Sequence, residues 1–284
     1  MDPTCLQYQA TAEEKAAFEK DGYLIVNNAI PADLVAELVP ISDRVDQQER
    51  QRMGLSATAR INHYDFIGKD DAYLKLLDWS TTLPKVWGLL SWHIQLYHTH
   101  MTYTPPEPAE HSLETHGVGL GWHQDSGMLN QDLESTPRPR VSLKVAYFLT
   151  DTTQPGRGNF YVLPGSHLLD ALPGADRKAQ VEGGIPVCVP AGTAVFFDRR
   201  LWHSGSHNYW QEPRRVLFYG YSYRWLRPRD DMTVAHYLDR CNPIQQQLLG
   251  VTHSGGRGYT SPTDEDVPLR TWLEQQQVIP GGSA

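Results

Sequence analysis

The amino-acid sequence predicts a mainly β fold with flanking helices around a double-stranded β-helix, or jelly-roll, core. From about residue 94 the chain is made of short β-like runs, and Gly or Pro residues separate nearly all of them. Strands and helices do not alternate in the way that a parallel Rossmann sheet requires. Both observations favour two packed sheets of short strands.

Two helices and a strand are expected before this β-rich region. Thr11 and Glu14 form the pattern of a capping box at the start of the helix-forming stretch AEEKAAFEKD, and Gly22 ends it. The apolar run YLIVNNAI, residues 23–30, then predicts a strand. A second helix is expected from Pro31, because proline suits the first turn of a helix.

The strands of the core are expected in five segments. These are residues 94–104, 140–151, 158–166, 184–198 and 214–225. The connections at 104–121 and 126–139 are long for a compact domain, which is typical of a lid or binding loop. A short helix is expected near PIQQQLL in the C-terminal part.

The length of the chain fits a single domain. It has 284 residues, and all-β domains often run to roughly 200–250 residues. We expect one domain over residues 1–284, with a helical arm and first strands in 1–93. The jelly-roll core with the candidate site is expected in 94–227, and a C-terminal extension in 228–284.

Charge and cysteine content exclude several classes of partner. The net charge of −8 and the lack of a Lys/Arg run argue against nucleic acid. No signal peptide is recognisable, and the apolar runs are far shorter than the roughly 20 residues of a membrane span. Three scattered cysteines indicate neither disulfides nor a zinc cluster. A cytoplasmic protein that binds a small molecule is expected.

The stretch GLGWHQDSGM places His123 and Asp125 two residues apart. In an extended backbone such residues project from one face, so both can bind one ion. Two histidines and one carboxylate are the ligand set of non-haem Fe(II) oxygenases. A second histidine is available downstream, because His203 follows the apolar run GTAVFFD and His207 follows a Ser/Gly-rich turn. Gln124 is expected to point away from the metal.

Two adjacent arginines begin the last expected strand. Neighbours on a strand point to opposite faces, so only one of Arg214 and Arg215 can face a pocket.

The sequence resembles the phytanoyl-CoA dioxygenase family over about residues 11–225, because FEKDGYLIV, WHQD, GNFYVLPGSH, AGTAVFFDRRLWHSGSHN and PRR occur in that family's order. That family comprises jelly-roll, cupin-like enzymes that use Fe(II), O2 and 2-oxoglutarate. The resemblance implies His123, Asp125 and His203 as the catalytic iron ligands. The family places an arginine eleven residues after the distal histidine, which implies Arg214 as the partner of the distal carboxylate of 2-oxoglutarate. A guanidinium can hold a carboxylate in a bidentate pair.

Further residues are candidates from their position alone. Thr102 and Tyr103 are expected to hydrogen-bond 2-oxoglutarate. Trp122 and Trp202 lie next to the proposed ligands, where core packing is the default but a ring could line the substrate pocket. Asn208, five residues after the distal histidine, is expected to hold a turn.

Lys144 interrupts the apolar strand VSLKVAYFL, where a lysine must pair or reach water. One reading buries the aliphatic stem and exposes the ammonium. The other turns Lys144 into the pocket to meet an anionic substrate or a cofactor carboxylate.

The remaining histidines are expected to be structural. His63 and Asp65 repeat the His-x-Asp spacing but lie before the β-rich region and outside the motif. His167 is expected to stabilise a turn. A substrate role is not expected for the other four histidines near the first core strand, which are His98, His100, His111 and His116.

The predicted function is that of an Fe(II)- and 2-oxoglutarate-dependent dioxygenase that hydroxylates an unactivated C–H bond of a small-molecule metabolite, releasing succinate and CO2. The alternatives are a non-catalytic jelly-roll binding protein and a cupin-like metalloenzyme that does not use 2-oxoglutarate. Halogenation is disfavoured, because halogenases of this type lose the carboxylate that Asp125 supplies here. The acidic chain has no basic patch for a CoA thioester, and it lacks the motif of ectoine hydroxylases around His-x-Asp.

Overall fold

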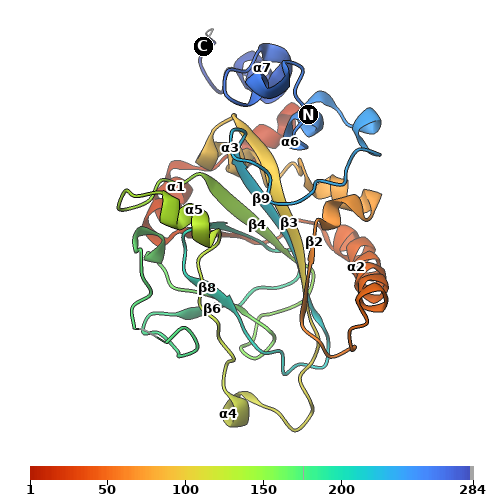
Figure 1. The fold of residues 1–284 in the computed structure, drawn as a ribbon, viewed down its shortest axis with the longest axis vertical. Coiled ribbons are helices and arrows are strands. Elements are labelled where there is room, and N and C mark those ends of the chain that lie inside the picture. Colours follow the sequence, from red (N-terminus) through yellow and green to blue (C-terminus); the bar gives the residue numbers. More distant parts are fainter. Residues whose placement is uncertain (175, 282–284) are drawn as a thin grey trace.

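A computed structural model describes residues 1–174 and 176–281 and confirms the jelly roll (Figure 1). One sheet has six strands in the order β1-β7-β4-β9-β3-β2, and the other has three in the order β6-β5-β8. Neighbouring strands in both sheets are antiparallel. The strands are β1 Tyr23–Val26, β2 Ile61–Tyr64, β3 Ile94–Thr104, β4 Ser142–Phe148, β5 Phe160–Val162, β6 Ile185–Val187, β7 Ala194–Asp198, β8 His203–Gly205 and β9 Arg214–Tyr223.

Helices flank the six-stranded sheet. These are α1 Ala12–Asp21, α2 Ala32–Met53, α3 Leu83–Leu90, α6 Pro243–Leu248 and α7 Pro268–Gln275, whose residues share its core. Two short helices, α4 Leu113–His116 and α5 Gly127–Asp132, do not belong to this layer. Figure 1 shows α2 beside the β2 edge, and α6 and α7 at the end of the molecule where both termini lie. The two long loops expected at 104–121 and 126–139 contain α4 and α5 respectively.

The N-terminal expectations hold, with one shortened element. Thr11 and Glu14 form the predicted capping box, and Gly22 ends α1 with φ +80°. α2 continues to Met53 although it contains Pro40. The expected strand 23–30 pairs with β7 only as far as Val26, because a turn follows in which Asn28 has φ +52°.

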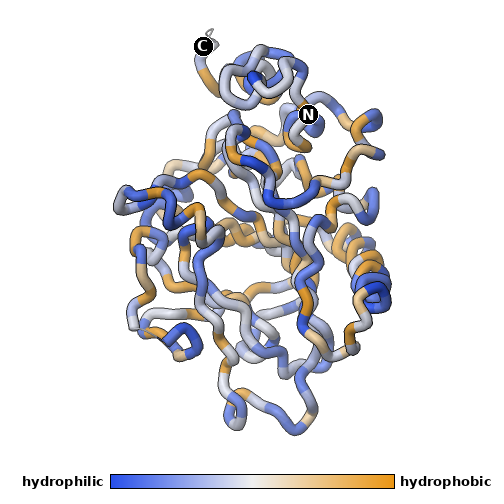
Figure 2. The backbone as a smooth tube through the Cα atoms, in the orientation of Figure 1, coloured by the Kyte–Doolittle hydropathy of each residue, from blue (hydrophilic) through white to orange (hydrophobic). Residues whose placement is uncertain are grey.

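Side chains of the six-stranded sheet alternate between two environments. On β4, Leu143, Val145 and Tyr147 pack in the core that the helices share, whereas Ala146 and Phe148 pack toward the three-stranded sheet. Figure 2 shows that apolar residues follow the strands, while polar residues predominate around α4 and at the end of α2. The interior between the two sheets is therefore reached only by every second residue of each strand.

A β-bulge in β3 changes which residues face that interior. The register with β9 shifts between Leu96 and His98. Leu96 and Met101 both belong to the helix-side core, although their spacing would put them on opposite faces of a regular strand. The bulge thus lets Leu96 stay in the core while His98, His100 and Thr102 line the interior.

The C-terminal extension packs on the helix side of the sheet. The short helix α6 in this extension was expected, whereas α7 was not. Strands β2 and β8, which lie elsewhere in the chain, were not expected either. Ile244, Leu248 and Leu269 belong to the same buried core as Ile94 of β3 and Val86 of α3. None of the helices in residues 1–174 and 176–281 combines the length and the hydropathy that a membrane span needs.

Candidate metal centre

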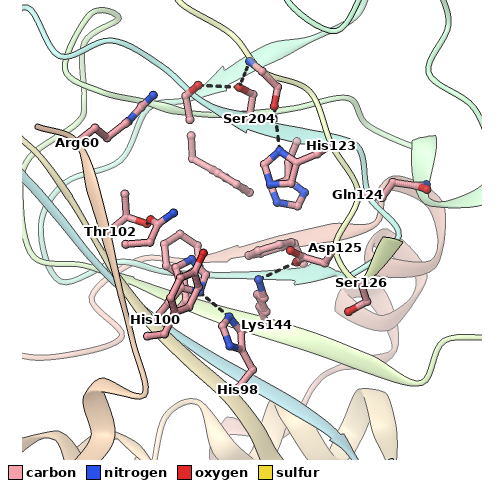
Figure 3. Close-up of a pocket in the computed structure, with 18 of the residues that line it drawn as sticks. Arg60, His98, His100, Thr102, His123, Gln124, Asp125, Ser126, Lys144 and Ser204 are labelled. Atoms are coloured by element: carbon pink, nitrogen blue, oxygen red, sulfur yellow. Dashed lines mark hydrogen bonds and ion pairs between the residues drawn. The ribbon is translucent and has the colours of Figure 1, made fainter. Parts of the chain in front are cut away.

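The structure brings His123, Asp125 and His203 together. One possible ligand atom from each lies within 4.8 Å of the others. Figure 3 shows His123 and Asp125 at this site. His203 begins β8, and His123 pairs with it through two backbone hydrogen bonds of 3.0 Å. The Asp125 N–H donates to the Arg199 carbonyl at 2.9 Å. The His-Gln-Asp segment is therefore held along the chain that leads into β8.

Backbone carbonyls set the tautomers of both histidines. His123 Nδ1 lies 2.9 Å from the Gly121 carbonyl, and His203 Nδ1 lies 2.8 Å from the Leu201 carbonyl. A carbonyl can only accept, so each Nδ1 carries the hydrogen and each Nε2 keeps a lone pair. Burial, with the neighbouring His123 imidazole, lowers the pKa of His203 to about 3. Both rings thus present the nitrogen that a metal ion needs.

Asp125 and Lys144 form a buried ion pair. Lys144 Nζ lies 2.9 Å from Asp125 Oδ2, with 3% and 7% of the side chains exposed (Figure 3). Burial alone would raise the pKa of Asp125, but the Lys144 ammonium and the two imidazoles outweigh it and lower that pKa. The reading of Lys144 as an exposed ammonium is therefore wrong, because its inward position on a central strand offers no route to solvent.

Gln124 points away from the metal ligands, as expected. Its side chain donates to the carbonyls of Leu169, at 3.0 Å, and Arg200. Figure 3 shows it directed away from His123 and Asp125.

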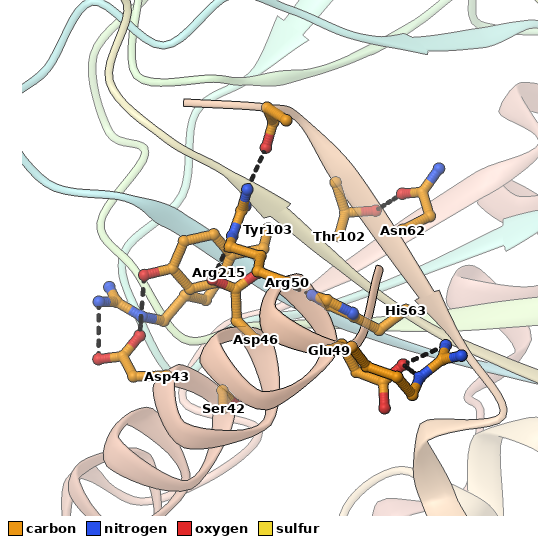
Figure 4. Close-up of polar contacts among 12 residues, drawn as sticks. Ser42, Asp43, Asp46, Glu49, Arg50, Asn62, His63, Thr102, Tyr103 and Arg215 are labelled. Atoms are coloured by element: carbon orange, nitrogen blue, oxygen red, sulfur yellow. Dashed lines mark hydrogen bonds and ion pairs between the residues drawn. The ribbon is translucent and has the colours of Figure 1, made fainter. Parts of the chain in front are cut away.

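Arg214 is a buried cation that lacks an ion-pair partner among the described residues. It is 2% exposed, and its Nε and one terminal nitrogen have no hydrogen-bond partner among the described residues. Burial, with the nearby Arg60, lowers the pKa of Arg214 to about 9. Arg215 instead binds Asp43 of α2 through contacts of 2.6 and 3.0 Å (Figure 4). Of the two adjacent arginines, it is therefore Arg214 that presents an unsatisfied guanidinium to the interior, where an anion would satisfy it.

The ligands and Arg214 line one cavity of about 490 Å³. Thr102 also lines it, and its hydroxyl donates to Asn62 Oδ1 at 2.8 Å. The expectation for Tyr103 is wrong: its hydroxyl donates to Asp43 at 3.1 Å on the helix side of the sheet (Figure 4). Thr102 and Tyr103 are neighbours on β3, so they face opposite sides.

The expectation that Trp122 or Trp202 lines the substrate pocket is also wrong. Both belong to a separate apolar cluster with Leu163 and Val181, outside the set of described residues that line the cavity. Trp122 Nε1 donates to the Ala179 carbonyl at 3.0 Å. Each tryptophan directly precedes a histidine ligand in extended chain, so its ring points away from the metal site.

Other polar residues take structural places. His207 Nδ1 lies 2.6 Å from Glu107 on a loop, away from the triad. His63 contacts Asp46 at 2.7 Å, and His167 contacts the Glu19 carbonyl at 3.0 Å. Asn208 spans its turn with hydrogen bonds to the carbonyls of Thr104 and Glu212, at 3.1 and 2.8 Å. His111 and His116 stack on each other near α4 with ring centroids 3.6 Å apart.

Several cavity residues were not anticipated. Arg60, directly before β2, and Asn62, on β2, line the cavity, and so does Arg229 of the C-terminal extension. His98 and His100 line the cavity beside Thr102. The period of two in these three polar residues was the available signal, since polar side chains alternating along a strand indicate a polar face.

Comparison with known proteins agrees with this geometry. A family model described as phytanoyl-CoA dioxygenase matches residues 18–216. An ectoine dioxygenase of Stutzerimonas stutzeri strain A1501 is 26% identical over 243 residues, covering 75% of this chain and 76% of that protein.

Solved structures share the fold. HygX from Streptomyces hygroscopicus, with nickel and 2-oxoglutarate bound, has a TM-score of 0.60 at 13% identity and covers 78% of this chain and 90% of its own. EctD from S. alaskensis, with 2-oxoglutarate and 5-hydroxyectoine, has a TM-score of 0.54 at 20% identity, with coverage of 75% and 76%.

The ion pair of Lys144 predicts a metal-dependent change in stability. Lys144→Met leaves the Asp125 carboxylate buried and unpaired, so the metal-free protein should lose about 3–5 kcal/mol of unfolding free energy. A divalent ion at the triad should recover much of this loss, because its charge replaces the ammonium. Thermal unfolding in EDTA and in Mn²⁺ measures both effects.

Lys85→Met is the matched control. Lys85 is also a buried lysine, and it pairs with Glu14 at 2.7 Å outside the cavity. The free energy of unfolding that Lys85→Met loses should be the same in EDTA and in Mn²⁺. A Lys144→Met protein as stable in EDTA as the wild type would contradict the prediction.

Proposed function

The chain belongs to the phytanoyl-CoA dioxygenase family, whose members are Fe(II)- and 2-oxoglutarate-dependent oxygenases, and we propose that it hydroxylates an unactivated C–H bond of a small-molecule metabolite. Succinate and CO2 are the co-products. The observation that carries the proposal is the vacant, buried Arg214 guanidinium in the same cavity as the His-Asp-His triad.

The triad has the chemistry that Fe(II) requires. Nε2 of His123, Nε2 of His203 and the Asp125 carboxylate would hold the ion, because hydrogen bonds occupy both Nδ1 atoms. Bound iron and 2-oxoglutarate supply the oxidising chemistry. The protein contributes two imidazoles whose Nδ1 atoms are held by backbone carbonyls, a carboxylate paired with Lys144, and a cavity beside them.

Arg214 is assigned to the distal carboxylate of 2-oxoglutarate. A carboxylate would satisfy the nitrogens that lack partners in the described protein, and the planar guanidinium matches its geometry. Gly158 leaves space for this arginine: a Cβ there would lie 3.2 Å from Arg214 Cβ. Thr102 is assigned as a further hydrogen-bonding group, through its hydroxyl in the cavity.

The competing functions leave part of this site unexplained. A binding protein with a vestigial site would not need three intact ligands, and a metalloenzyme without 2-oxoglutarate would leave Arg214 without an anion. We also assign the protein to the cytoplasm, in keeping with free Cys5, Cys188 and Cys241. The shared core of arm, strands and extension supports one domain over the chain.

Anaerobic titration with Fe(II) and then 2-oxoglutarate tests the cofactor assignment. We expect the wild-type protein to develop the visible charge-transfer band of the chelated complex, and His203→Ala to lose it. Arg214→Met should need on the order of 100-fold more 2-oxoglutarate, because charged hydrogen bonds worth about 3 kcal/mol are lost.

Arg215→Met is the control for this titration, because Arg215 binds Asp43 on the other face of the sheet. It should titrate like the wild type. Folded, iron-loaded protein without the band would instead support a binding protein or an enzyme that does not use 2-oxoglutarate.

Neighbouring substitutions in the His-x-Asp motif provide a second test. Asp125→Ala removes a ligand and should abolish succinate formation coupled to substrate oxidation. Gln124→Ala removes a side chain that points away from the triad, so its affinity for Fe(II) should stay nearly unchanged. Anaerobic calorimetry measures the Fe(II) affinity, and a succinate assay measures the coupled turnover. If the two variants lost Fe(II) affinity and turnover to the same extent, the assignment of Asp125 as a ligand would be wrong.

A further inference from the structure

A chain of buried polar groups leads from the C-terminal extension into the cavity. Asp230 Oδ1 lies 2.9 Å from His98 Nδ1, and His98 Nε2 lies 2.7 Å from His100 Nδ1. The side chains of His98 and Asp230 are 0% and 2% exposed. His100 stacks on Phe218 with ring centroids 4.2 Å apart, and it lines the cavity (Figure 3).

The order of donors and acceptors along this chain determines what His100 can bind. Asp230 Oδ2 accepts from the N–H and hydroxyl of Thr99, so the carboxylate acts as an acceptor and His98 Nδ1 carries a hydrogen. Neutral His98 then has a bare Nε2, which accepts from His100 Nδ1–H. Burial lowers the pKa of both histidines and keeps them neutral. His100 Nε2 is left with a lone pair.

The charge of the cavity limits the substrate further. Four cations, Arg60, Lys144, Arg214 and Arg229, and one carboxylate, Asp125, are among its described lining residues, so 4 − 1 gives a net charge of +3. Fe(II) and the doubly charged 2-oxoglutarate would cancel each other. In Figure 3 Arg60 lies at the opposite edge of the cavity from His98 and Lys144. Lys144 is paired with Asp125, so among the described lining residues Arg229, which lies over the Tyr64 ring, is the cation left near His100. It repels a cationic substrate and attracts an anion.

We propose that the substrate is an anion bearing a hydroxyl group, which donates its hydroxyl hydrogen to His100 Nε2 and directs its negative charge toward Arg229. The rings of Phe218 and Tyr64 also line the cavity, with centroids 4.2 and 6.2 Å from that of His100, and provide apolar contact. Asp230 is a positioning residue that sets the tautomer of His100 through His98. This inference rests on the proposed oxygenase function and names its substrate class.

Ligand-observed NMR with a matched panel tests the substrate class. The protein is loaded with diamagnetic Zn²⁺ and 2-oxoglutarate, and the probes are gluconate, glucose, glucosamine and adipate. We expect gluconate, the hydroxylated anion, to bind at least tenfold more tightly than glucosamine, the hydroxylated cation, and adipate, an anion without hydroxyls, to bind more weakly than gluconate. Equal binding of gluconate and glucosamine would overturn the proposal.

Substitutions at Asp230 and His100 test the direction of the hydrogen bonds that run from Asp230 through His98 to His100. Asp230→Asn places an amide donor opposite His98 Nδ1, so the hydrogens of both histidines should exchange places and His100 Nε2 should become protonated. ¹⁵N NMR of the histidine rings reads this exchange directly, which a general loss of structure would not reproduce. His100→Leu should weaken gluconate binding about tenfold, since one hydrogen bond is lost.

Two controls separate the possible failures. His111→Leu removes a histidine outside the cavity and should bind gluconate like the wild type. The Fe(II)–2-oxoglutarate band should persist in His100→Leu. A wild-type protein that shows the band but no preference for gluconate over glucosamine contradicts only the substrate class. A wild-type His100 with hydrogen on Nε2, or unchanged gluconate affinity in His100→Leu, would refute the recognition role.

Discussion

The alternation of side chains across the six-stranded sheet is the constraint on which this site depends. Each strand turns one set of residues toward the helices and the other toward the three-stranded sheet. On β9 this directs Arg214 into the cavity and Arg215 to Asp43 of α2. On β4 it encloses Lys144 between the sheets, where Asp125 supplies its counter-charge. The anion site at Arg214 and the position of Lys144 thus share one geometric origin, whereas the metal ligands come from β8 and from the segment that pairs with its first residue.

Electrostatics makes the site incomplete without ligands. Asp125 has a protein partner, whereas Arg214 has nitrogens that none of the described residues satisfies. An unpaired buried charge is costly, so such a cavity favours an incoming anion. A buried pair of Asp125 with Lys144 also keeps the ligand oxygens charged when no metal is bound. The protein therefore maintains the site at some cost in its own stability, which cofactor binding can offset.

The C-terminal extension contributes to the cavity as well as to the core. Its apolar residues pack with α3 and β3, while Asp230 hydrogen-bonds His98 on the cavity side. The bulge between Leu96 and His98 allows both contacts, because it changes which side chains of β3 face inward. A segment outside the matched residues 18–216 thereby orients a side chain beside the metal ligands.

The sequence by itself determined the jelly-roll class, the His-x-Asp pair and the choice between two alternating faces, because these follow from local spacing and turn residues. The same alternation, applied to Trp122 and Tyr103, would also have excluded them from the cavity. Only the tertiary structure decided that Lys144 pairs with Asp125, that nitrogens of Arg214 stay unsatisfied by the residues it describes, and that Asp230 hydrogen-bonds His98. Those contacts join residues 19 to 132 positions apart, or depend on burial by several strands at once, and no local pattern encodes them.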